Sequence, residues 1–141
     1  MITCTRRIQF CAGHRVRGHE GKCKNMHGHN YVALITAVAE QLDTVGRVID
    51  FSVLKERIGG WIDKHWDHGF IYWDKDIMMQ DIFTVHTSHQ KHFEMPSNPT
   101  AENMAEFLLR VICPQELSGT NVLVTEVVLW ETENCFAKAT L

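Results

Sequence analysis

The stretch Cys23-Lys24-Asn25-Met26-His27-Gly28-His29 determines how the rest of this 141-residue chain is interpreted. It leads into Tyr31-Val32-Ala33-Leu34-Ile35, where β-branched and aromatic residues predict a strand running from about His27 to Ala39. Side chains alternate between the two faces of a strand, so His27 and His29 would leave the same face. The sequence therefore predicts two imidazoles side by side on a rigid support.

A third histidine ends a second predicted strand, Thr3 to His14, in which apolar residues occupy the even positions and His14 shares their parity. Two strands of this length, close together in the chain, are expected to pair antiparallel. His14, His27 and His29 would then converge, and three neutral imidazoles make a metal site. Zinc is the expected ion, although iron and other divalent cations bind similar sites.

The composition is that of one globular domain spanning residues 1–141. Apolar residues make up 45% of the chain and charged residues 22%, which argues against disorder. The net charge of -3 gives no general electrostatic attraction to nucleic acid or to an anionic membrane. We therefore expect neither nucleic acid nor a membrane surface as a partner, although a phosphate of a small substrate could meet a local basic patch.

The cysteines indicate the compartment. Their number is odd and no paired spacing relates them, so a disulfide framework is not expected: Cys4, Cys11, Cys23, Cys113 and Cys135. The chain shows no charged leader followed by an apolar segment and no apolar run of membrane-spanning length. We expect a reduced, soluble, cytoplasmic protein.

Two helices are expected further along the chain. The first should start at Asp50 or Ser52, either of which can cap it, and run to about His65 on an apolar stripe. The second should start at Thr100, which can cap it, and end at Pro114.

Two more strands are expected after the second helix, over Asn121–Trp130 and Phe136–Leu141, joined by a turn at Glu131–Asn134. The resulting order is ββ-α-(variable segment)-α-ββ. The predicted class is α+β, with two helices on one face of a four-stranded antiparallel sheet.

The variable segment, about residues 72–95, is the least regular part of the pattern. It contains Ile77-Met78-Met79 and Ile82-Phe83, which could form a short helix, and then His86, His89 and His92. Three histidines at steps of three could form a second metal site in a helical turn. The β-branched residues and serine around them favour a solvated loop instead.

Cys23 leaves two kinds of site open. As a fourth ligand its thiolate would close the coordination shell and make a structural site; away from the metal it would leave an open position for substrate. A thiolate beside a dication could then serve as a base or nucleophile near neutral pH.

Asp67-His68 and Glu131 are further candidates. A carboxylate can fix the tautomer of an adjacent imidazole, although a solvated aspartate beside a helix-terminal histidine explains the pair equally well. Glu131 ends an apolar strand and could accept two parallel hydrogen bonds from a 2-amino-4-oxopyrimidine ring; a surface glutamate is the simpler alternative.

Several motifs in order resemble the 6-pyruvoyl-tetrahydropterin synthase family, and the likeness covers nearly the whole chain. They are Phe10-Cys11-Ala12-Gly13-His14, Cys23 with His27-Gly28-His29-Asn30-Tyr31, Val48-Ile49-Asp50-Phe51, Trp66-Asp67-His68, Asn98-Pro99-Thr100-Ala101-Glu102-Asn103 and Trp130-Glu131-Thr132. The resemblance implies a tunnelling fold (T-fold), assembled as trimers that stack into a homohexamer with active sites at subunit interfaces.

The resemblance also implies a role for each motif residue. His14, His27 and His29 match zinc ligands, and Cys23 matches the catalytic cysteine. Asp67 and His68 match its acid–base partners, Glu131 matches the carboxylate that anchors the pterin ring, and Thr100 and Glu102 lie in the motif that lines the pterin pocket.

The gap of three residues between Cys23 and His27 is similar to that of the bacterial 6-carboxytetrahydropterin synthase branch, which serves queuosine biosynthesis. The implied enzyme is a zinc-dependent carbon–carbon lyase. Its substrate would be 7,8-dihydroneopterin triphosphate and its products 6-carboxytetrahydropterin, acetaldehyde and triphosphate. Basic residues of one loop could neighbour the triphosphate, or form a solvated surface: Arg15, Arg17, Lys22 and Lys24.

Two alternatives stay open at this point. One is a 6-pyruvoyl product, formed by triphosphate elimination alone. The other is a non-catalytic, zinc-stabilised binding module with Cys23 as fourth ligand. The segment of about 72–95 is longer than in compact bacterial members, which leaves room for an insertion that covers the pocket or meets another subunit.

Overall fold

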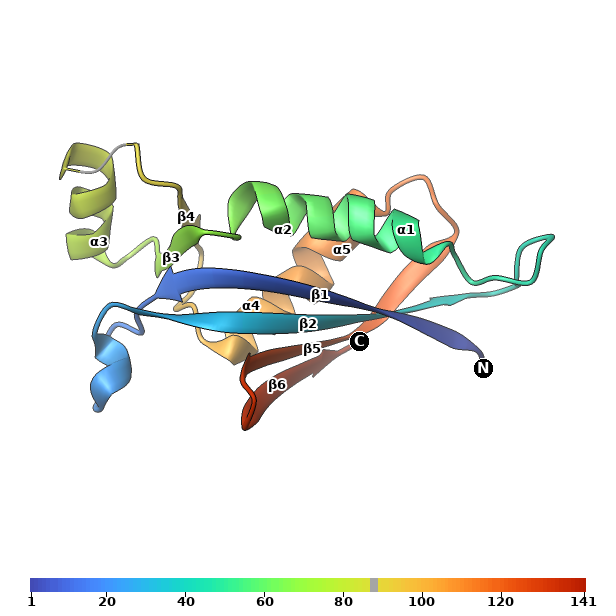
Figure 1. Ribbon diagram of the computed structural model, residues 1–141, viewed down its shortest axis with the longest axis horizontal. Coiled ribbons are helices and arrows are strands. Elements are labelled where there is room, and N and C mark those ends of the chain that lie inside the picture. The colour runs from blue at the N-terminus through green and yellow to red at the C-terminus, as the bar shows by residue number, and fades with distance from the viewer. Residues whose placement is uncertain (87–88) are drawn as a thin grey trace.

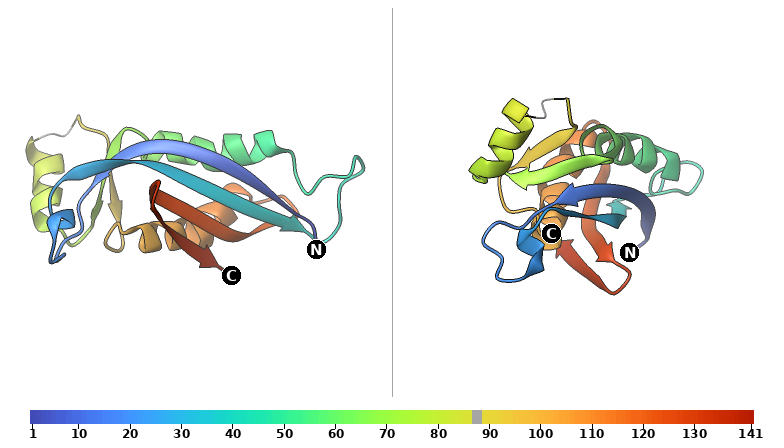
Figure 2. Two further views of the ribbon diagram at one scale, coloured as in Figure 1. Left: turned by 60° about the horizontal axis from the view of Figure 1, so that its bottom comes forward. Right: turned by 60° about the vertical axis from the view of Figure 1, so that its left-hand side comes forward.

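A computed structural model describes residues 1–86 and 89–141 as one mixed sheet with helices packed on it (Figure 1). The strand order is β4-β3-β1-β2-β5-β6. The turned views in Figure 2 show that β1 and β2 are long and curved and that the helical segments gather over the sheet. No helix in the described ranges has the length and apolar character needed to cross a membrane.

The centre of the sheet is the pair β1 (Thr3–His14) and β2 (His27–Ala39), as the sequence predicts. They run antiparallel with a continuous register from Thr3 opposite Val38 to His14 opposite His27. Even positions of β1 and odd positions of β2 face the core, which confirms the predicted parity. The register places two of the three histidines directly opposite each other.

On the other side of β2 lie β5 (Val122–Thr132) and β6 (Cys135–Thr140), both antiparallel. β5 is longer than predicted, because Glu131 lies within the strand rather than in the turn. This carries the Glu131 carboxylate along the sheet toward the histidines.

The two predicted helices are present as continuous helical runs. The first comprises α1 (Phe51–Leu54), a π-helical stretch and α2 (Gly60–His65), and the side chain of Asp50 caps it by accepting a hydrogen bond from the Ser52 N–H. Its apolar residues pack on the same core as those of β1 and β2.

The second run comprises α4 (Ala101–Phe107), a π-helical stretch and α5 (Cys113–Glu116), with Thr100 as N-cap. The predicted end at Pro114 is wrong, because the run continues through it to Glu116. The backbone before the proline is wound more widely, and buried Ile112, Cys113 and Leu117 hold the last turn against the core despite the missing N–H.

The prediction of a four-stranded antiparallel sheet is wrong in number and in direction. Two short strands, β3 (Gly69–Trp73) and β4 (His92–Met95), extend the sheet beyond β1 and run parallel to it and to each other. β3 has no polar alternation, because it is buried on both faces, as parallel strands are. The α+β class with helices on the sheet is confirmed.

The second face of β3 is covered by the variable segment. α3 (Ile77–Asp81) continues as a π-helical stretch over 82–86, and Met79 and Phe83 pack on Phe70 and Tyr72 in a small separate core. The short helix suggested by Ile77-Met78-Met79 and Ile82-Phe83 is therefore confirmed. The solvated loop expected around the histidines is wrong for residues 84–86, which continue the helix, and for His92, which lies in β4. This apolar packing outweighs the weak helix propensity of its β-branched residues.

The segment is tied to the end of β1 by an ion pair. The Arg15 guanidinium donates to both carboxylate oxygens of Asp76, over 2.6 and 2.7 Å. Asp76 is fully buried, and it also caps α3 by accepting a hydrogen bond from the Met79 N–H.

His86, His89 and His92, all within the described ranges, do not form the second metal site that was the alternative to a loop. His86 contacts Asp81, His89 lies in an exposed turn, and His92 stacks on Phe83 within β4. Thr87 and Ser88, two of the residues behind the loop prediction, lie outside the described ranges.

Candidate metal centre and neighbouring acid–base residues

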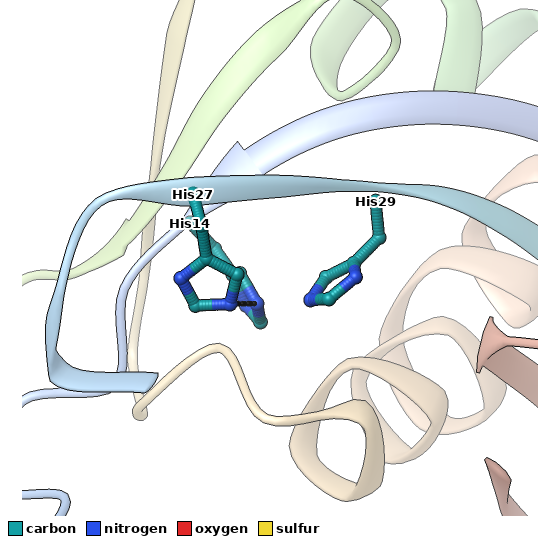
Figure 3. Close-up of side chains that lie close together, drawn as sticks. All are labelled: His14, His27 and His29. Carbon is teal, nitrogen blue, oxygen red and sulfur yellow. Dashed lines mark hydrogen bonds between the residues drawn. The ribbon is translucent and has the colours of Figure 1, made fainter. Parts of the chain in front are cut away.

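His14, His27 and His29 converge below the β1–β2 pair, as predicted (Figure 3). Ring centroids lie 4.6 Å apart for His14 and His27, and 5.1 Å for His14 and His29. Gly28 lies between the two β2 histidines, and a Cβ there would come within 3.2 Å of the Ala12 carbonyl oxygen. A glycine thus lets the two strands approach closely where they carry the ligands.

Two backbone carbonyls fix the tautomers of two of the rings. The Nδ1–H of His14 donates to the Pro99 carbonyl, and that of His27 donates to the Asn25 carbonyl, both over 2.7 Å. The Nε2 atoms then carry lone pairs, and they face each other at 3.0 Å (Figure 3). Two lone pairs at this distance repel unless a cation lies between them.

His29 completes the group. Its Nε2 is buried and has no hydrogen-bond partner among the described residues. A buried polar atom without a partner is rare, and a metal ion would satisfy it. The three Nε2 atoms therefore fit a cation such as zinc, for which tetrahedral geometry places ligand nitrogens about 3.3 Å apart.

Burial favours the neutral imidazole of His14 and of His29. His14 is 1% exposed, and desolvation lowers its pKa to about 4. The hydrogen bond to Pro99 raises the pKa of His14, whereas charge repulsion from His27 and His29 lowers it further. Desolvation also lowers the pKa of His29, although Glu131 opposes the shift. Neutral imidazole is the form that binds metal.

Glu131 approaches the same group from β5. Its carboxylate oxygens lie 3.5 Å from His29 Nε2 and 4.0 Å from His14 Nε2. The side chain is 22% exposed, so one part of it faces the histidines and another remains accessible. Sequence reasoning placed Glu131 at a strand end in a pocket, and the structure places it beside the metal ligands.

Asp67 and His68 lie between α2 and β3, and they contact Cys11 rather than the histidine group. The Asp67 carboxylate accepts hydrogen bonds from the Cys11 N–H at 3.0 Å and from His68 Nδ1 at 2.7 Å. Burial raises the pKa of Asp67, but these hydrogen bonds outweigh it and leave the pKa below its usual value. The pair forms the carboxylate–imidazole arrangement that the sequence suggested.

This pair faces the opposite side of the sheet from the three histidines. Cys11 pairs with Asn30 across the β1–β2 register, one position away from Ala12 and His29, so its side chain leaves the other face. Within one chain the structure therefore does not bring Asp67 and His68 together with the metal ligands.

Residues 3–140 match the sequence profile of the 6-pyruvoyl tetrahydropterin synthase family. The chain belongs to this family. Members of this family are enzymes, so the prediction of an enzyme is confirmed.

Named relatives and solved structures agree with this membership. A 6-carboxy-5,6,7,8-tetrahydropterin synthase of Rickettsia bellii is 43% identical over 138 residues, 98% of this chain and 99% of the relative. Its namesake from Rickettsia felis is 45% identical over 139 residues, with the same coverage of both chains. A 6-pyruvoyl tetrahydropterin synthase of Caenorhabditis elegans has the same fold, with a TM-score of 0.71 at 23% identity over 99% of this chain and 95% of that chain.

Cys23 stands apart from the metal ligands in this family member. It lies half-buried in the short 3₁₀ turn Lys22–Lys24 that precedes β2. Among the described residues no cysteine belongs to the group formed by the three histidines. The geometry therefore favours the open-site alternative over a closed shell of one cysteine and three histidines.

The Asn98–Glu102 stretch, which matches the family's pocket motif, lies under His14. Thr100 uses its hydroxyl to cap α4 by accepting a hydrogen bond from the Asn103 N–H, while Glu102 is exposed. Because the Pro99 carbonyl orients His14, this stretch is joined directly to the metal group.

The basic loop of this synthase-family chain divides into two parts. Arg15 is paired with Asp76, and Arg17 donates to the Lys75 carbonyl. Lys22 and Lys24 are exposed on either side of Cys23. Arg15 is therefore engaged in its ion pair, whereas Lys22, Lys24 and the exposed Arg17 are accessible to an anionic ligand.

Sequence reasoning missed Cys11 as a neighbour of Asp67 and His68. The strand parity of Thr3–His14 already placed Cys11 on the face away from the core. What it could not supply was the parallel pairing of β1 with β3, which brings residues 67–69 to residues 11–12.

Proposed function

We propose that this protein is a zinc-dependent lyase that converts 7,8-dihydroneopterin triphosphate to 6-carboxy-5,6,7,8-tetrahydropterin, releasing acetaldehyde and triphosphate. The observation that carries the proposal is the convergence of the Nε2 atoms of His14, His27 and His29. The choice of the carboxy product is supported by the names of the Rickettsia relatives, which align over nearly the full chain. We assign the activity to queuosine biosynthesis because the three-residue gap between Cys23 and His27 resembles that of the bacterial branch with this role.

The three histidines would hold the ion. When bound, a divalent cation supplies positive charge that acidifies protons next to a substrate oxygen. With only three protein ligands, one position stays open to the substrate. The Glu131 carboxylate, close to His29, would accept hydrogen bonds from N–H groups at the edge of the pterin ring. These bonds would direct the side chain of the substrate toward the histidines.

Cys23, Asp67 and His68 would move the protons. Asp67 holds His68 Nδ1–H, so His68 Nε2 is the atom that can take or return a proton. Because β1 separates this pair from the histidines within one chain, we propose that the site is assembled between subunits, with Cys23 and the histidines from one chain and Asp67 and His68 from another. A homohexamer built from two trimers, as the family resemblance implies, would provide such interfaces.

Further parts of the pocket follow from the same arrangement. Thr100 and Glu102 would line the pterin pocket, since their stretch lies under His14. Lys22 and Lys24 would neighbour the triphosphate, since both are exposed beside Cys23. The whole chain would be one catalytic domain, with about 72–95 as an insertion that buttresses β3. We place the enzyme in the cytoplasm, where its five free cysteines would stay reduced.

Product analysis tests the proposal. Purified protein supplied with zinc and 7,8-dihydroneopterin triphosphate should yield 6-carboxytetrahydropterin, acetaldehyde and triphosphate in equal amounts. A 6-pyruvoyl product without acetaldehyde would identify the alternative family activity. Absence of any triphosphate release would contradict both activities.

A further inference from the structure

A second group of metal-ligand side chains lies on the sheet face opposite the three histidines. It consists of Cys11, Asp67 and His68, which offer a sulfur, an oxygen and a nitrogen, all within 4.8 Å of one another. This mixture of soft and borderline donors suits zinc and its neighbours among the transition metals, and it does not suit magnesium or calcium.

The distances are close to those of a tetrahedral ion. Bonds of about 2.3 Å to sulfur and about 2.0 Å to nitrogen place the two ligand atoms about 3.5 Å apart. Cys11 Sγ lies 3.7 Å from His68 Nδ1 and 3.9 Å from Asp67 Oδ1. The His68 side chain is 77% exposed, so its ring can turn to direct an Nδ1 lone pair at an ion without disturbing the core.

The hydrogen bonds around the group hold its members together. Asp67 Oδ2 and His68 Nδ1 lie 2.7 Å apart and share the Nδ1 proton, so an ion that replaces this proton would meet both side chains. Main-chain bonds join Cys11 to the pair in both directions, from its N–H to Asp67 Oδ1 and from the His68 N–H to its carbonyl. These bonds hold His68 in a left-handed conformation, with φ of 58°.

The group is also open to an incoming ion. A depression of about 400 Å³ on this face is lined by Cys11, Gly13, Gly28, Asn30 and His68. Gly13 and Gly28 contribute no side chains to this lining, and the Phe70 ring packs against Gly13. An entry path and a partly preformed ligand set are two requirements of a metal site.

We infer that Cys11, Asp67 and His68 form a second binding site for a borderline-soft divalent cation, with zinc as its expected occupant. The ion would bind Cys11 Sγ as thiolate, His68 Nδ1 and Asp67 Oδ1, and solvent would fill the fourth position. Binding releases the thiol proton to solvent and moves the imidazole proton of His68 from Nδ1 to Nε2. On the proposed function, an ion here would withdraw His68 from proton transfer, so excess zinc would inhibit turnover.

Titration of the metal-free full-length protein with Co²⁺ tests the inference. Two equivalents should bind per chain, and the second should produce the charge-transfer absorption of a cobalt–thiolate bond. Cys11→Ser should abolish this absorption and the second equivalent while keeping the first. Cys135→Ser, which changes an exposed cysteine outside the group, is the matched control and should keep both.

A second variant separates loss of ligand from loss of fold. His68→Asn removes the imidazole but suits the left-handed backbone, and it should also bind one equivalent with an unchanged circular dichroism spectrum. Binding of a single equivalent by the unaltered protein would overturn the inference. So would loss of the thiolate absorption in Cys23→Ser with its retention in Cys11→Ser. Because the readout is stoichiometry rather than turnover, these outcomes are independent of whether the lyase activity is found.

Discussion

Removing the buried carboxylate of Asp76 should destabilise the protein strongly. Asp76 is fully buried, accepts two hydrogen bonds from Arg15 and caps α3, so Asp76→Ala leaves an arginine without its counter-ion in a position only 16% exposed. Breaking a buried ion pair from one side costs about 3–5 kcal/mol. We expect the free energy of unfolding to fall by about that amount. Urea unfolding followed by the fluorescence of the four tryptophans measures it.

The control is an ion pair of the same type in solvent. Glu106 pairs with Arg110 one helical turn away, with both side chains about half exposed, and Glu106→Ala should cost less than about 1 kcal/mol. Replacing both buried partners, with Arg15→Met and Asp76→Leu, should recover much of the loss, since no uncompensated charge remains. If Asp76→Ala and Glu106→Ala proved equally mild, the argument that this pair anchors the insertion would be refuted.

Three further predictions concern the metal group. Cys23→Ala should retain zinc, measured by metal analysis, while product formation stops; loss of zinc would instead make Cys23 a ligand. In the metal-free protein the pKa of His14 is lowered to about 4, so between about pH 6.5 and that value the unfolded chain binds a proton that the folded chain does not. The free energy of unfolding should therefore fall as the pH drops through this window, by up to about 1.4 kcal/mol per pH unit, and urea midpoints independent of pH there would contradict the burial argument. In Cys11→Ser, which lacks the second proposed zinc site, zinc at a free concentration one hundred times its dissociation constant should raise the free energy of unfolding by about 2.7 kcal/mol. Adding His27→Ala to this variant should abolish the gain, and an equal gain in the double variant would exclude the three-histidine site.

The sequence predicted the features that depend on local pattern. The parity of apolar residues predicted β1, and β-branched and aromatic residues predicted β2. Strand alternation then predicted the common face of the histidines, and the side chains of Asp50 and Thr100 predicted the helix starts. These signals are periodic or adjacent in the chain, so no knowledge of tertiary contacts was needed.

The features that were missed depend on contacts between distant segments. β3 and β4 are short, and they are stabilised by parallel pairing with β1 and by the cover of α3 rather than by their own pattern. The helical run continues past Pro114 because buried neighbours hold it. The meeting of Cys11 with Asp67 and His68 follows from the same parallel pairing, and no spacing in the sequence encodes it.

The acceptors that orient His14 and His27 are main-chain carbonyls, of Pro99 and Asn25. No side-chain replacement can delete a carbonyl, so these two ligands are protected from the single substitutions that usually weaken the surroundings of a metal. The orientation of these rings can change only if the backbone conformation at Asn25 and Pro99 changes. Affinity for an ion would therefore depend on the backbone, and altering that affinity would require redesign of a loop.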